Sequence, residues 1–240
     1  MSTPNAAVGS RVSQFEHAYE VILDQILRGR LPPGSAISRR GLAGTLNMGV
    51  RPVTEALQRL ESEGLIESLP RVGTRVRLPS EQDIRGHYIV REALESQSAR
   101  LFAEKSSNRE REELAAMARR LDALYDAGEP DLSNAESSEN YWFEVHTVHS
   151  QFHMRIAECT GCQALCAAIR RNQILVLNWL YDNTFQPQPN PGYWHSKLIE
   201  ALSSGSVDVA DRAMREHTRY GIEEVLRRRE KYSNWSNGYL

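Results

Sequence analysis

The sequence predicts a mainly α-helical protein in two parts, with short helices and a β-hairpin at the N-terminus and an all-helical bundle after them. Apolar residues recur at helical spacing through most of the chain, and strand-like runs are confined to residues 65–78. Breaks rich in Gly, Pro, Asn and Ser separate the segments. With 40% hydrophobic and 25% charged residues, the composition is that of a soluble globular protein rather than a disordered or fibrous one.

The first ten residues are expected to form a flexible arm. They lack the charged-then-apolar profile of a secretory signal. No apolar run approaches the ~18 residues that a membrane-spanning helix needs. Three cysteines cannot all pair within the chain, so reduced thiols are the simpler interpretation. We therefore expect a cytoplasmic protein.

Residues 11–78 contain the pattern of a winged helix-turn-helix. The first helix runs to about Arg28, and Ser38 can cap a second, short helix that ends near residues 47–49. Pro52 suits the first turn of a third helix, which Gly64 ends. Residues 65–69 and 74–78 then predict two strands joined by a tight turn, a hairpin that would form the wing.

Residues 79–240 show no strand-like alternation and predict a bundle of about six helices. Turn-forming residues separate the expected helices. The predicted helices cover residues 81–106, 109–127, 139–159, 163–183, 193–203 and 206–231.

The net charge of −2 conceals an asymmetry between the two parts. Residues 28–77 hold nine Arg and four Glu, a balance of +5, so the rest of the chain carries −7. A basic module joined to an acidic one is typical of a DNA-binding protein with a separate second domain. Side chains near the start of a recognition helix reach base edges, and flanking Arg residues neutralise phosphates. Arg39, Arg40, Arg51 and Thr54 stand at such positions.

The N-terminal third resembles the winged helix-turn-helix of GntR-family transcriptional regulators. The resemblance rests on these segments: Ile26-Leu27-Arg28-Gly29, Leu31-Pro32-Pro33-Gly34, the run from Pro52 to Glu61, Glu63-Gly64-Leu65-Ile66 and Gly73-Thr74-Arg75-Val76. It implies operator contacts by Arg40, by residues 50–54, which include Val50, and by Gly73 at the wing tip. Many relatives have Ser-Arg-Thr-Pro-Val-Arg where this chain has Gly49-Val50-Arg51-Pro52-Val53-Thr54. This difference bears on the family's usual operator sequence rather than on DNA binding itself.

Four histidines of the second part are candidate metal ligands. His149 and His153 are four residues apart, so they lie on one helix face one turn apart. His195 and His217 flank the break at 203–206 almost symmetrically, and an antiparallel hairpin would bring them to a similar height. Nitrogen-rich ligation of this kind suits Zn²⁺ or Ni²⁺.

The second part also resembles the helical FCD domain of the FadR-like subgroup. Arg91-Glu92-Ala93-Leu94-Glu95, Phe152-His153 and the histidines at 195 and 217 carry this looser likeness. It implies that three metal-binding histidines of relatives correspond to His153, His195 and His217. His149 stands where those relatives have an Asp, and His146, one turn earlier, is the alternative ligand.

Arg91 corresponds to an Arg that faces the ligand pocket in relatives, where a guanidinium would hold a carboxylate with two hydrogen bonds. An ion pair with Glu92 or Glu95 is the alternative role. Asn178 and Tyr181 are further candidate effector contacts, although core packing is the competing explanation. The pattern Cys159-x2-Cys162-x3-Cys166 spans a helix break without a second pair, which favours buried thiols over a zinc site.

These observations predict a DNA-binding transcriptional regulator, a homodimeric repressor on a pseudo-palindromic operator. Its bundle would bind a divalent metal and a small carboxylic acid that changes operator affinity. One alternative is a metal-free regulator that responds to an acyl thioester. The other is a metal-dependent hydrolase with Glu144 or Glu158 as base, which a four-histidine site without a flanking acid motif disfavours.

Overall fold

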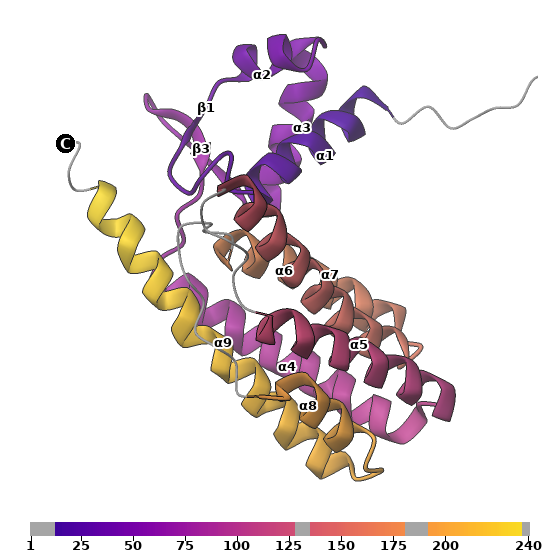
Figure 1. Ribbon diagram of the computed structural model, residues 1–240. Coiled ribbons are helices and arrows are strands. Elements are labelled where there is room, and N and C mark those ends of the chain that lie inside the picture. The colour runs from indigo at the N-terminus through magenta and orange to yellow at the C-terminus, as the bar shows by residue number, and fades with distance from the viewer. Residues whose placement is uncertain (1–12, 128–134, 181–191, 237–240) are drawn as a thin grey trace, which may run out of the picture.

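The computed structural model describes residues 13–127, 135–180 and 192–236. In this part of the chain a winged-helix unit lies at one end of a helical bundle (Figure 1). The predicted fold class is therefore confirmed. No described helix is both long enough and apolar enough to cross a membrane.

The winged-helix unit begins with α1 (Gln14–Leu27), α2 (Arg39–Thr45) and α3 (Val50–Ser62). Ser38 caps α2 as predicted, because its side-chain oxygen accepts a hydrogen bond of 3.1 Å from the backbone N–H of Gly41. Pro52 lies in the first turn of α3, where a missing N–H costs no helical hydrogen bond. Gly64 has a φ of 81° and follows the end of α3, a conformation that favours glycine.

The wing is part of a three-stranded antiparallel sheet with the order β1-β3-β2. The predicted strands are β2 (Ile66–Leu69) and β3 (Gly73–Val76), whereas β1 (Ala36–Ile37) was not predicted. Ala36 pairs with Arg75 and Ile37 with Thr74. A two-residue strand is too short to show an alternating pattern, so only its pairing with β3 reveals it.

The bundle comprises the described helices that follow the sheet. These are α4 (Glu81–Lys105), α5 (Asn108–Asp126), α6 (Ala135–Glu158), α7 (Gln163–Leu180), α8 (Trp194–Leu202) and α9 (Val207–Ser236). Most bounds agree with the predicted ranges within a few residues, but α6 begins four residues earlier than predicted and α9 ends five residues later. Ser80 with Asp83 and Ser107 with Glu110 form capping boxes that fix the starts of α4 and α5.

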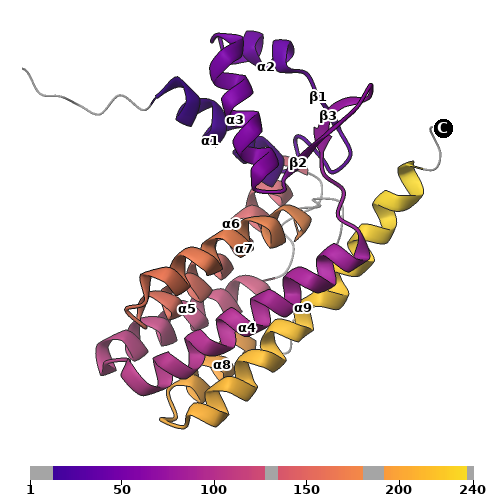
Figure 2. The same cartoon turned by 180° about the vertical axis from the view of Figure 1, so that it is seen from behind.

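The described residues form two hydrophobic cores, and α4 contributes to both. Ile84 and Tyr88, near its start, pack with the core of the winged-helix unit, as does Val225 of α9. Ala99 and Phe102, near its end, belong to the core of the bundle. Figure 2 shows α4 and α9 side by side along the bundle and reaching toward the winged helix. Both helices therefore connect the two parts through buried apolar contacts.

Candidate metal and DNA-binding sites

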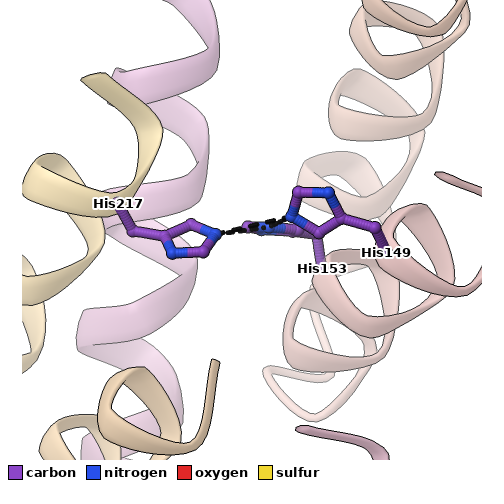
Figure 3. A group of neighbouring side chains, drawn as sticks. All are labelled: His149, His153 and His217. Carbon is purple, nitrogen blue, oxygen red and sulfur yellow. Dashed lines mark hydrogen bonds between the residues drawn. The ribbon is translucent and has the colours of Figure 1, made fainter. Parts of the chain in front are cut away.

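Three imidazoles from two helices face one another inside the bundle (Figure 3). His149 and His153 are one turn apart on α6, and His217 approaches from α9. The Nε2 atom of His153 lies 2.9 Å from that of His149 and 3.1 Å from that of His217. The Nε2 atoms of His149 and His217 are 3.5 Å apart. Such a cluster gathers nitrogen ligand atoms around one point.

His195 of α8 lies beside this triad. It is fully buried, and its ring centroid is 5.0 Å from that of His149 and 5.2 Å from that of His217. Asp122 of α5 accepts hydrogen bonds from Nδ1 of His195 at 2.8 Å and from the backbone N–H of both His195 and Ser196 at 2.9 Å. The opposite ring nitrogen, Nε2, is buried and has no hydrogen-bond partner among the described residues.

Glu95 of α4 gives His153 a similar carboxylate neighbour. Its Oε2 lies 2.7 Å from Nδ1 of His153, and its Oε1 accepts a hydrogen bond of 2.9 Å from Nε of Arg91. Burial alone would raise the pKa of Glu95, but the positive charge of Arg91 and the contact with His153 outweigh it and lower the pKa to about 2. Glu95 is therefore a buried carboxylate at neutral pH.

The two carboxylates favour one tautomer of each imidazole that they contact. A neutral imidazole carries one N–H, and that hydrogen is favoured on Nδ1 when Nδ1 faces a carboxylate. In the neutral form of either ring, Nε2 then carries a lone pair. Burial lowers the pKa of His149 and of His217 well below 6.5, and the neighbouring imidazoles lower them further. Burial also lowers the pKa of His195, partly offset by Asp122. Neutral imidazole is the form that ligates a metal.

The other candidates of the bundle lie apart from this triad or outside the described residues. His146 is buried on α6 but does not belong to the triad. Tyr181 lies outside the described residues, and the side chain of Asn178 is likewise not described. Cys159 is buried, Cys162 exposed and Cys166 half-buried, and no cysteine belongs to a metal-holding group within the described chain.

Arg91 is buried and pairs with Glu95, which is the alternative that the sequence analysis left open for it. The other suggested partner, Glu92, instead binds Arg215 and Arg219 of α9. Sequence reasoning missed both Asp122 and the position of Glu95 at the cluster. The i, i+4 spacing of Arg91 and Glu95 signalled their ion pair, but nothing in the sequence connects Asp122 to a histidine 73 residues later.

The candidate DNA contacts lie on α2, α3 and the wing. Arg40 is exposed, and Arg39 donates a hydrogen bond of 3.3 Å to the hydroxyl of Thr74. Arg51 has a side chain that is 90% exposed and is held by Glu55 at 2.9 Å. Val50 is 48% exposed at the start of α3. The side chain of Val50 is therefore accessible to solvent at the N-terminal end of α3.

Thr54 and Gly73 complete this set. The hydroxyl of Thr54 donates a hydrogen bond of 2.8 Å to the carbonyl of Val50, so its hydrogen is used within α3. The lone pairs of the hydroxyl oxygen can still accept a hydrogen bond. Gly73 is exposed with a φ of 102°, a backbone conformation that an L-residue rarely adopts. The turn that ends the wing therefore depends on this glycine.

Comparison with known proteins identifies the class to which this fold belongs. Residues 14–76 match the model of bacterial regulatory proteins of the gntR family, and residues 87–220 match the FCD domain. The chain therefore belongs to the GntR family of transcriptional regulators and carries an FCD domain. The matched families and relatives are regulators rather than enzymes, which confirms that part of the prediction and leaves the hydrolase alternative without support.

Individual relatives cover nearly the whole chain at low identity. The "Probable D-xylose utilization operon transcriptional repressor" of Paenarthrobacter nicotinovorans is 24% identical over 208 residues, 87% of each chain. The HTH-type transcriptional repressor RspR of Escherichia coli K12 is 21% identical over 231 residues, 92% of each chain. The structure of E. coli McbR/YncC has a TM-score of 0.69 at 20% identity and covers 90% of this chain and 99% of its own. At this identity the structural likeness shows the fold alone.

Proposed function

We propose that this GntR-family regulator is a cytoplasmic repressor that binds a pseudo-palindromic operator as a homodimer. We further propose that its bundle holds one divalent ion, to which a small carboxylate effector binds. The observation that supports the metal site most strongly is the buried Nε2 of His195, which faces no hydrogen-bond partner among the described residues while Asp122 fixes its ring. A buried polar atom without a partner is costly, and a metal ion would satisfy it.

The donor set favours Zn²⁺ or Ni²⁺ over Mg²⁺ or Ca²⁺. The proposed ligands are four imidazoles, His149, His153, His195 and His217, whereas Mg²⁺ and Ca²⁺ prefer oxygen ligands. Both carboxylates, Glu95 and Asp122, contact the far side of a histidine ring. Such contacts orient ligands and raise their basicity. When bound, the ion would supply positive charge and an exchangeable coordination position for a carboxylate.

Arg91 is the proposed second contact of the effector, together with Asn178 and Tyr181. Its Nε–H is used by Glu95, and a guanidinium has four further N–H donors. On this proposal an effector bound at the ion changes how α4 contacts α6, because Arg91 and Glu95 belong to α4 and His153 to α6. Calorimetric titration of small mono- and dicarboxylates into metal-loaded, metal-free and Arg91→Ala protein tests it. Equal affinity for loaded and metal-free protein would show that the effector does not bind at the ion.

The proposed DNA-binding surface comprises Arg39, Arg40, Val50, Arg51, Thr54 and Gly73. The proposal is supported by the exposure of Arg40, Arg51 and Val50, which all lie in the winged-helix unit that matches the GntR family model. Log affinity for the operator should fall linearly with log salt concentration, because phosphate neutralisation releases counterions.

His153→Ala should remove most metal binding. In metal-replete buffer, the wild-type protein should melt at a higher temperature than in chelator, because an ion that binds only the folded state stabilises it by mass action. The variant should show little difference between the two buffers. Elemental analysis and thermal denaturation measure both effects.

His146→Ala is the matched control for this experiment, since His146 is a buried histidine of the same helix. It should retain one ion per chain. If wild type and His153→Ala melt alike with and without chelator, the histidine cluster is not a metal site. Bound metal in protein purified without added ions would, conversely, exclude the metal-free acyl-thioester alternative.

A further inference from the structure

The outer face of α4 carries exposed apolar side chains that no described element covers. Ile89 is 71% exposed and Val90 47% exposed. They lie in a stripe of exposed residues at helical spacing, which we term the α4 face. Its members are Gln82, Gly86, Ile89, Val90, Ala93 and Gln97. In Figure 2, α4 runs along the near side of the bundle with α9 beside it.

No member of the α4 face is charged, although the helix is rich in charged residues. Arg85, Arg91 and Glu92 all lie beside this stripe or on other faces, where their ion partners hold them. Gly86 is exposed within the interior of the helix, where glycine costs about 1 kcal/mol relative to alanine. A Cβ at Gly86 would meet nothing within 4 Å in its own chain. The packing of a single chain therefore does not explain this glycine.

The α4 face is complementary to itself under a two-fold rotation. If two copies of α4 cross antiparallel with the axis between residues 89 and 90, Ile89 faces Val90 of the other copy. Gly86 then faces Ala93, and Gln82 faces Gln97. Each pair matches residues of similar size and polarity, and the small pair lets the two helices approach closely. A two-fold interface requires this kind of self-complementarity.

We propose that the α4 face is the contact between two copies of this chain in the homodimer. The proposal rests on the homodimer of the proposed function and names the surface that forms it. From Gln82 to Gln97 the face is about 22 Å long at 1.5 Å per residue. Stable interfaces bury ~800 Å² per partner, so the contact extends beyond one helix. A pocket of about 220 Å³ between α4 and α9, lined in part by Ile89 and Ile222, offers room for partner side chains.

Charge substitutions at the centre of the face test the proposal. Ile89→Glu and Val90→Lys should each weaken dimerisation at least tenfold, because each buries an unpaired charge at the contact. The double variant, with both changes in one chain, should recover much of the loss, since the new carboxylate of each copy would then face the new ammonium group of the other. Sedimentation velocity over a range of protein concentrations measures the dissociation constants.

Val72→Glu is the matched control, because Val72 is also 71% exposed but lies in the wing. Val72→Glu should have the same dimer dissociation constant as the wild type. Circular dichroism should show that every variant keeps its helix content. A wild-type monomer at all concentrations would refute both the homodimer and its surface. A dimer that persists in Ile89→Glu, or single variants that weaken it without recovery in the double variant, would refute this surface alone. Metal and operator binding are measured separately and do not depend on either result.

Discussion

His149 and His217 give the metal-free protein a predictable response to acid. Their pKa values in the folded protein lie well below 6.5, chiefly because burial disfavours the imidazolium. The unfolded chain therefore binds protons first as the pH falls below about 6.5. The free energy of unfolding should decrease from there downward, by up to about 1.4 kcal/mol per pH unit for each histidine.

Urea denaturation in chelator at about pH 7.5, 6.5 and 5.5 measures this dependence, since these values bracket the ordinary histidine pKa. The double variant His149→Gln/His217→Gln should show a shallower decline. Glu95 does not interfere, because its stabilising effect is lost only as the pH falls from about 4.5 toward its folded pKa of about 2. If the free energy of unfolding declines with falling pH equally steeply in both proteins, His149 and His217 are not the groups that take up these protons.

Glu95→Gln tests whether the carboxylate beside Nδ1 of His153 strengthens binding of the proposed ion. The substitution keeps the shape of the side chain and removes its charge. Loss of a carboxylate that orients a histidine ligand costs roughly 10- to 100-fold in metal affinity in general, and we expect a loss of this size. Competition with a metal chelator measures it. Glu92→Gln is the control on the same helix, since Glu92 pairs with Arg215 and Arg219 instead, and its metal affinity should stay near that of the wild type.

At the scale of secondary-structure elements, α3 is the expected recognition helix. Arg51→Ala should weaken operator binding by about 1 to 3 kcal/mol if Arg51 contacts a base, and should relax specificity at that position. Arg119→Ala, an exposed arginine of α5, is the control and should leave affinity nearly unchanged. Band-shift titration with the upstream region of the gene compares the two variants. Equal losses in both would indicate that net charge alone determines binding.

Local signals explain which elements the sequence predicts. A capping serine, a first-turn proline and apolar residues at i, i+3 and i+4 all act within one helix, so α2 and α3 were predicted correctly. The sequence does not predict β1, because its two residues can be recognised as a strand only from their pairing with β3. The same distinction applies to the site. The spacing of His149 and His153 is local, whereas the contact of Asp122 with His195 depends on how α5 packs against α8.

At the scale of the whole molecule, α4 connects the histidine cluster with the DNA-binding part. Glu95 contacts His153, Arg91 binds Glu95, and the guanidinium of Arg91 lies 5.5 Å from the ring of Tyr88. Tyr88 belongs to the core of the winged-helix unit. These residues follow one side of a single helix at spacings of three and four. A rigid helix can transmit a displacement at one end to contacts at the other.

The proposed ion and the operator should therefore affect each other's binding. Titration of the operator in Ni²⁺ and in chelator gives the factor by which the ion changes DNA affinity, and titration of the ion with and without operator should give the same factor, because coupling is reciprocal. Arg91→Lys keeps the positive charge but removes the planar guanidinium that contacts both Glu95 and Tyr88. The ion should still bind this variant, while the coupling factor moves toward one. If Arg91→Lys has the same coupling factor as the wild type, coupling between the two sites does not depend on the Arg91 contact. Helix α9 would then be the next element to test, because its Val225 also packs against the winged-helix unit.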